Sequence, residues 1–125
     1  MKLEDAIKGI IKYREAIHSQ HMWSDPVRLS EVLVKLSVCN SYLADNIAPL
    51  HKQATDTAYS IYTEAKASGE AIKTAEMMSR GESTEERKEY ENVSNIYRST
   101  NSLITVIQSR IKVLENQLKN EGQIT

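Results

Sequence analysis

The stretch that decides the fold is Tyr90–Leu118, YENVSNIYRSTNSLITVIQSRIKVLENQL. Along it, residues of one face recur at alternating steps of three and four, which is a seven-residue repeat typical of a helix packed along another helix. The repeat consists of Tyr90, Val93, Tyr97, Thr100, Ile104, Ile107, Ile111, Leu114 and Leu118. Three apolar residues beside the repeat, Leu103, Val106 and Val113, widen the apolar face and favour a bundle or an assembly of several chains.

Three more helices are predicted upstream of this stretch. Apolar residues at helical spacing predict a first helix over residues 3–19, and residues 18–24 have no sustained period and are expected to connect it to the next. Asp25-Pro26 predicts the start of a second helix, because the Asp carboxylate can cap the first turn and proline is tolerated there. An apolar stripe continues to residue 67 and stays in phase across Pro49, which predicts a kink near residues 45–49.

The second half of the chain begins with a break at residues 68–69. A short third helix is expected over residues 70–79, ending near Gly81. Ser83-Thr84-Glu85-Glu86 has the pattern of a capping box, which predicts a last helix over residues 84–120 with frayed residues 121–125.

The predicted fold class is therefore all-α, in one domain of residues 1–125. It has an N-terminal helix and two long antiparallel helices joined by a short one, as a helical bundle or coiled-coil oligomer. Two helices of this length leave a second apolar face, which oligomerisation would cover. The predicted oligomer interface comprises Tyr97, Leu103, Ile104, Ile107, Ile111, Leu114 and Leu118.

Charge and cysteine content limit the possible partners and compartment. The 16 basic and 17 acidic residues leave a net charge of -1, so binding to nucleic acid would need a local basic patch. One cysteine, Cys39, no apolar run of about 20 residues and an acidic N-terminal start favour a cytoplasmic protein with no membrane partner.

The sequence offers little for catalysis or metal binding. His18 and His21 are three residues apart, with Asp25 nearby, but no second His or Cys pair completes a metal site. Neither a nucleophile–base arrangement nor a phosphate-binding glycine loop is present. We therefore expect no enzyme activity, no metal and no cofactor.

Two groups of residues suggest binding. Aromatic side chains among cations near the first helix junction are the kind of set that holds single-stranded nucleic acid, although Trp23 could instead pack on the second helix. This predicted nucleic-acid-binding set is Lys8, Lys12, Tyr13, Arg14, Trp23 and Arg28. The last helix also carries many hydroxyl and amide groups, which predict either a solvated face or a ligand-binding strip of Asn95, Tyr97, Arg98 and Asn101.

Two segments resemble small all-helical proteins of the early or recombination regions of tailed phages. One is the Tyr- and Ala-rich stretch Ala58–Gly69, and the other is Tyr90-Glu91 to Tyr97 followed by Leu103-Ile104 to Leu114. The layout of residues 26–118 is similar to that of phage recombination mediators, which form helical rings and help load a recombinase onto single-stranded DNA. The near-neutral charge departs from what a DNA-binding member of that family would show.

The leading hypothesis is a non-enzymatic phage accessory protein of DNA recombination or replication. It would organise single-stranded DNA or a recombinase through a helical homo-oligomer in the host cytoplasm. A second hypothesis is an anti-defence protein that inhibits a host defence protein, in the manner of an anti-CRISPR, or sequesters a signalling nucleotide. A third is a structural scaffold without a small ligand.

Overall fold

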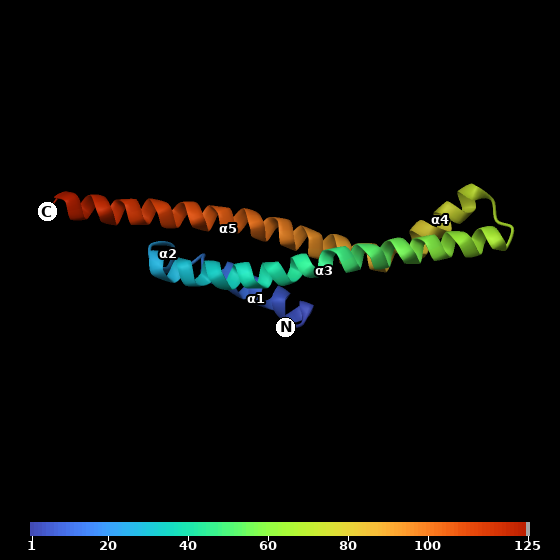
Figure 1. The fold of residues 1–125 in the computed structure, drawn as a ribbon, viewed down its shortest axis with the longest axis horizontal. Coiled ribbons are helices and arrows are strands. Elements are labelled where there is room, and N and C mark those ends of the chain that lie inside the picture. Colours follow the sequence, from blue (N-terminus) through green and yellow to red (C-terminus); the bar gives the residue numbers. More distant parts are fainter. Residues whose placement is uncertain (125) are drawn as a thin grey trace. The chain divides into compact units, whose positions relative to one another are not determined.

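The computed structural model describes residues 1–124 and is built from helices (Figure 1). Helix accounts for 90% of the chain, and none of the described residues is in a strand. The all-α class is thus confirmed. The elements are α1 (Leu3–Ala16), α2 (Gln20–Trp23), α3 (Pro26–Ala67), α4 (Ile72–Glu82) and α5 (Thr84–Ile124).

Most helix bounds agree with the predictions to within a few residues, and α3 has the predicted bounds of 26 and 67. The first helix ends at Ala16 rather than residue 19, and the predicted connection contains the one-turn helix α2. The short helix α4 spans 72–82 instead of 70–79. The last helix was expected to end at residue 120 with a frayed end, but α5 continues to Ile124, and residue 125 lies outside the described residues.

Local signals at both ends of α3 act as the sequence indicates. The Asp25 carboxylate accepts hydrogen bonds from the amides of Val27 at 3.0 Å and Arg28 at 3.2 Å, which caps the first turn. At the other end, Gly69 adopts a φ of 90°, where a side chain would be strained, and the amide of Glu70 donates to the Ala65 carbonyl at 3.0 Å. The helix therefore ends where glycine reverses the backbone.

The capping box predicted at the start of α5 does not form. The amide of Ser83 donates to the Ser79 carbonyl at 3.2 Å, and the Ser83 hydroxyl donates to the same carbonyl at 2.5 Å. In a capping box, the Ser83 amide would instead donate to the side-chain oxygen of Glu86. Because α4 reaches Glu82 and its hydrogen bonds continue into Ser83, the residue before α5 already has its donors satisfied.

Pro49 lies inside α3, so the helix continues through this residue, as expected. The kink near residues 45–49 stays a prediction.

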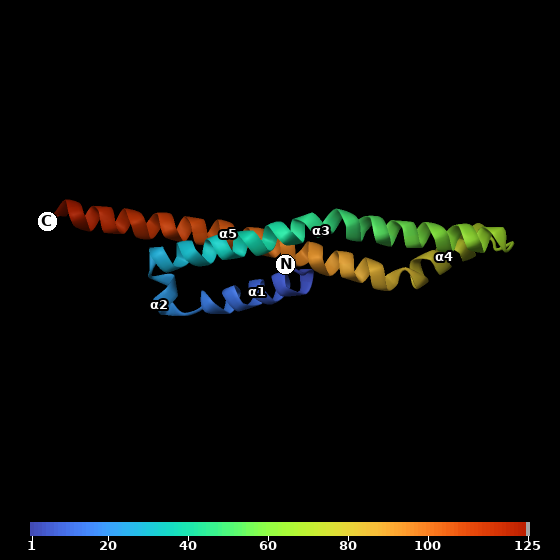
Figure 2. The same cartoon turned by 60° about the horizontal axis from the view of Figure 1, so that its bottom comes forward.

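The chain divides into two compact units, each described by itself. The first holds residues 1–43 with the part of α5 from Ile96 onward, so that α1, the first part of α3 and the second part of α5 lie side by side (Figures 1 and 2). Its core contains one face of each helix. The buried apolar residues are Ala6, Ile10, Ile17, Leu29, Val32, Leu36, Cys39, Leu43, Ile107, Ile111 and Leu114.

The second unit holds residues 44–95 and buries less apolar surface. Small side chains form most of its core, with Ala54, Ala65 and Ala75 each no more than 4% exposed and Val93 beside them at 1%. Such residues allow helix backbones to approach closely. The Ser79 hydroxyl of α4 donates to the Ala58 carbonyl of α3 at 2.8 Å and ties these two helices together.

Candidate nucleic-acid interface

The candidate interface lies where α1 packs on α3 in the first unit. Gly9 allows this packing, because a Cβ atom at that position would lie 2.9 Å from the Cys39 sulfur. The two helices are therefore close enough for side chains at their edge to meet. Burial also raises the pKa of the Cys39 thiol above its ordinary value, which favours the protonated form.

Tyr13 is the centre of the candidate interface. The ammonium groups of Lys12 from α1 and Lys35 from α3 each lie 5.6 Å from the centre of its ring. Both lysine residues are exposed and the tyrosine is half-buried. An aromatic ring that can stack on a base, near cations that can reach phosphates, is a combination that binds single strands without sequence preference. We call Lys12, Tyr13 and Lys35 the tyrosine–lysine patch.

Arg14, one of the predicted DNA contacts, is used inside the protein instead. Its guanidinium donates to the hydroxyl of Thr100 at 3.0 Å and to that of Ser99, which links α1 to α5. Thr100 is fully buried, so the hydrogen bond satisfies a polar group in the core. Arg14 is thus a structural residue in this arrangement.

Three other members of the predicted set also have partners within the chain. Trp23 is half-buried with the Arg110 guanidinium 5.7 Å from its ring, and the Arg110 Nε donates to the Trp23 carbonyl at 3.0 Å. Arg28 lies 3.5 Å from the Asp25 carboxylate, and Lys8 lies 3.5 Å from that of Glu4. These exposed ion pairs are weak, so Lys8 and Arg28 can exchange partners, whereas Trp23 is held by Arg110.

Lys35 belongs to the patch, but it is not among the residues that the sequence predicted to bind nucleic acid. It lies 22 positions after Tyr13 and in a different helix. In the sequence it is one of several lysines on the polar side of a long amphipathic helix. Only the packing of α1 on α3 brings it to the ring, so no local pattern could have identified it.

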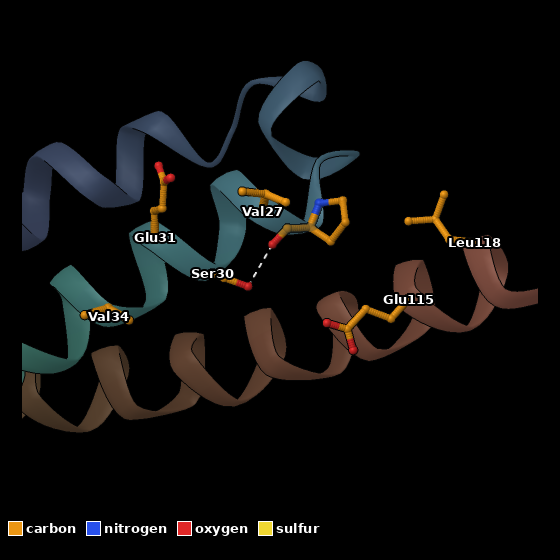
Figure 3. A pocket seen from close by; sticks show the side chains of 7 residues that line it. Val27, Ser30, Glu31, Val34, Glu115 and Leu118 are labelled. Carbon is orange, nitrogen blue, oxygen red and sulfur yellow. Dashed lines mark hydrogen bonds between the residues drawn. The ribbon is translucent and has the colours of Figure 1, made fainter.

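The seam predicted to join different chains is largely buried inside the first unit. Ile107, Ile111 and Leu114 are no more than 9% exposed, and Tyr97, Leu103 and Ile104 are half-buried. Leu118, at 57%, is the member that stays exposed. It lines a shallow hollow of about 550 Å³ between α3 and α5, together with Val27, Val34, Glu31 and Glu115 (Figure 3).

The alternative ligand strip on α5 is partly engaged by α3. The side-chain amide of Asn40 donates to the Asn101 side-chain oxygen at 2.8 Å and to the Tyr97 carbonyl at 3.3 Å. Asn95 and Arg98 are exposed. Asn40 was not singled out in the sequence, although a buried asparagine within an apolar stripe is a signal for such a polar layer.

The second unit has a hollow of its own, of about 270 Å³, between α3 and the start of α5. The His51 and Tyr90 rings meet edge to face on its wall, with centres 4.9 Å apart, and Arg87 adds a guanidinium. Ala54 and Ala58 form its apolar side. Glu91 adds a carboxylate to the same lining. Rings beside an apolar surface can hold a small planar ligand.

Within the part of the chain that the structure describes, no three His, Cys, Asp or Glu residues gather closely enough to ligate a metal ion. Every helix in that part falls short of the length of apolar sequence that crossing a bilayer requires. Comparisons with protein-family models, with curated proteins and with solved structures find no match to this chain.

Proposed function

We propose that the protein is a non-enzymatic, self-assembling helical protein that organises single-stranded DNA or a recombinase in DNA recombination or replication. The observation that carries this proposal is the tyrosine–lysine patch, because two exposed lysines from different helices flank one aromatic ring. With a net charge of -1, the whole molecule does not attract DNA, so contact depends on this local group.

In this proposal, α3 and α5 form an antiparallel coiled-coil pair that positions the patch. Three contacts in the first unit support the pairing, since early residues of α3 and the segment before it meet late residues of α5. Asn40 lies against Asn101, while Trp23 lies against Arg110. Still later in α5, Leu118 lines the same hollow as Pro26. Arg14 then fixes α1 on this pair.

The proposal predicts that Lys12→Ala with Lys35→Ala weakens binding to a labelled single-stranded oligonucleotide. We expect a loss of about tenfold or more at low salt, equivalent to about 1.4 kcal/mol. Two fewer phosphate contacts should also reduce the slope of log affinity against log salt by about 1.4. Fluorescence anisotropy at several salt concentrations measures both quantities.

The matched control is Lys73→Ala with Lys88→Ala. It removes the same two charges from exposed lysines of the second unit. If both double variants weaken binding equally, general charge and not the patch is responsible. If the unaltered protein fails to bind at low salt, the DNA-binding part of the proposal is wrong.

A second candidate function is sequestration of a signalling nucleotide, and the hollow of the second unit favours it. The His51 and Tyr90 rings are suited to a base, and Arg87 could bind a phosphate if its guanidinium releases the Arg80 carbonyl, to which it donates. A nucleotide at one hundred times its dissociation constant would stabilise the fold by about 2.7 kcal/mol. A thermal-shift screen with cyclic and linear nucleotides would detect this.

Two arginine variants separate the hollow from the predicted strip. Arg87→Ala should abolish the thermal shift if the hollow binds the nucleotide, and Arg98→Ala should leave it unchanged. The opposite result assigns binding to the strip that contains Tyr97 and Arg98. Absence of any shift with every nucleotide rejects this second function.

A further inference from the structure

The outer side of α5 carries a line of uncharged residues, distinct from the seam that forms the core. Its members follow one another at steps of four and three and are all exposed. We call the following residues the outer seam: Ser102, Val106, Ser109, Val113, Asn116 and Asn120. Val106 and Val113 are 52% and 46% exposed, although Ile107 and Leu114 beside them are buried.

This outer seam is unusual for this chain because it carries no charge. Charged residues make up 26% of the sequence, and the first turns of α5 are densely charged, with Glu85, Glu86, Arg87, Lys88, Glu89 and Glu91. In contrast, residues 99–109 contain none, and the charged residues that follow in 110–120 are not members of the seam: Arg110, Lys112, Glu115 and Lys119. A solvated helix face is normally rich in charge, whereas the centre of a protein interface is depleted of it. The composition of the outer seam is therefore that of a contact surface.

We infer that a second copy of this chain packs its own α5 against the outer seam, forming a two-fold dimer. In a two-fold interface the same patch is used on both subunits, so like charges near the axis would face each other and repel. A seam of hydroxyl, amide and valine side chains avoids this repulsion. The outer seam lies along a single helix, so α5 of another copy offers a surface of the same length and composition.

The exposed apolar stripe of α3 is less suited to a two-fold contact, because charged residues lie within and beside it. Val27, Val34 and Val38 are 66%, 62% and 54% exposed, but Glu31 lies within their stripe. Glu115 lines the same hollow from α5 (Figure 3). Two copies joined through this hollow would bring four carboxylates together. The α3 stripe thus serves as a control surface of similar exposure.

The proposed interface is small. Residues 102–120 span about 28 Å of helix, and one pair of helices of this length falls among the weak interfaces of less than about 1,200 Å². The dimer should therefore form with a micromolar dissociation constant. Valine and serine side chains allow the two helices to lie close together, and the asparagines at one end would favour one register.

The test compares two double variants that add the same charge to equally exposed valines. Val106→Glu with Val113→Glu alters the outer seam, and Val34→Glu with Val38→Glu alters the α3 stripe. Light scattering from about 10 μM to about 1 mM should show the mass of the unaltered protein rising from 14.2 kDa towards twice that value. The outer-seam variant should stay close to 14.2 kDa over the same range, which requires a dissociation constant at least about a hundredfold higher, and the α3 variant should behave like the unaltered protein.

The inference deepens the proposed function, and the outcomes distinguish the two. If the unaltered protein dimerises and the outer-seam variant does so equally, or if only the α3 variant dissociates, the assignment to α5 is wrong while self-assembly stands. A mass of 14.2 kDa at every concentration overturns the dimer and the self-assembly together. Binding of the oligonucleotide through Lys12 and Lys35 is then still tested separately. Circular dichroism checks that each variant keeps its helices.

Discussion

At the scale of single residues, the first unit combines an apolar core with a polar layer that joins its three helices. Arg14 of α1 and Asn40 of α3 both donate to residues 97–101 of α5. Within residues 1–124, the buried Nε of Arg14 and Oδ1 of Asn40 lack hydrogen-bond partners. Each unsatisfied group costs about 1–3 kcal/mol, so this layer contributes specificity of pairing more than stability.

Gly9 is the residue on which the packing of α1 depends. We predict that Gly9→Ala lowers the free energy of unfolding, because its methyl group would overlap the Cys39 sulfur, and that Cys39→Ala relieves the effect. The clash should cost about 1–3 kcal/mol, partly offset by a gain of up to about 1 kcal/mol in helix propensity. A double-mutant cycle in urea measures the coupling between the two positions.

Gly81→Ala is the control for this cycle. A Cβ atom at Gly81 meets no described atom within 4 Å, so alanine should stabilise α4 by about 0.5–1 kcal/mol. If Gly9→Ala stabilises the protein as Gly81→Ala does, with or without the Cys39 sulfur, the close contact between α1 and α3 is not as described.

At the scale of elements, α5 presents two seams with different tasks. The seam through Thr100, Ile107 and Leu114 is buried within the chain, and the outer seam through Val106 and Val113 faces solvent. The first is apolar along most of its length, so its periodicity predicts a packed face, but the sequence left open whether the same chain or another one covers that face. Burial by α1 and α3 makes that decision.

Neighbouring residues of α5 allow a direct test of this assignment. Ile107 is fully buried and Val106 is 52% exposed. We predict that Ile107→Ala lowers the free energy of unfolding by about 2–5 kcal/mol, since it leaves a cavity in the core. Val106→Ala should change it by no more than about 0.5 kcal/mol in dilute monomer. Equal losses in urea titrations would contradict the observed orientation of the helix.

At the scale of the whole molecule, two units with different cores share the long helices α3 and α5. The first buries large side chains such as Ile10, Leu29 and Ile107, and the second relies on alanines. Because burial of large apolar side chains contributes about 1.5–3 kcal/mol each, the first unit has the larger source of stability. It also carries the tyrosine–lysine patch and the outer seam, so the proposed DNA binding and dimerisation depend on the more strongly packed unit.

The sequence by itself determined the all-α class, the bounds of α3 and the face of α5 that enters the core. These features follow from rules that act over a few residues: the step of three or four along a helix, the Asp25 cap and the glycine at position 69. The predicted capping box failed for a related reason. The Ser83 amide, which the box requires, already donates to the Ser79 carbonyl near the end of α4. The local pattern did not define where α4 ends.

Only the tertiary structure decided which polar residues remain available for a partner. Arg14 and Thr100 are 86 positions apart, yet their hydrogen bond joins α1 to α5 through a residue that was predicted to contact DNA. The same packing brings Lys35 to Tyr13 and leaves the outer seam uncovered. Periodicity shows that a helix has an apolar face, but the neighbour that covers this face, and the side chains brought together at its edge, depend on contacts between segments distant in the chain.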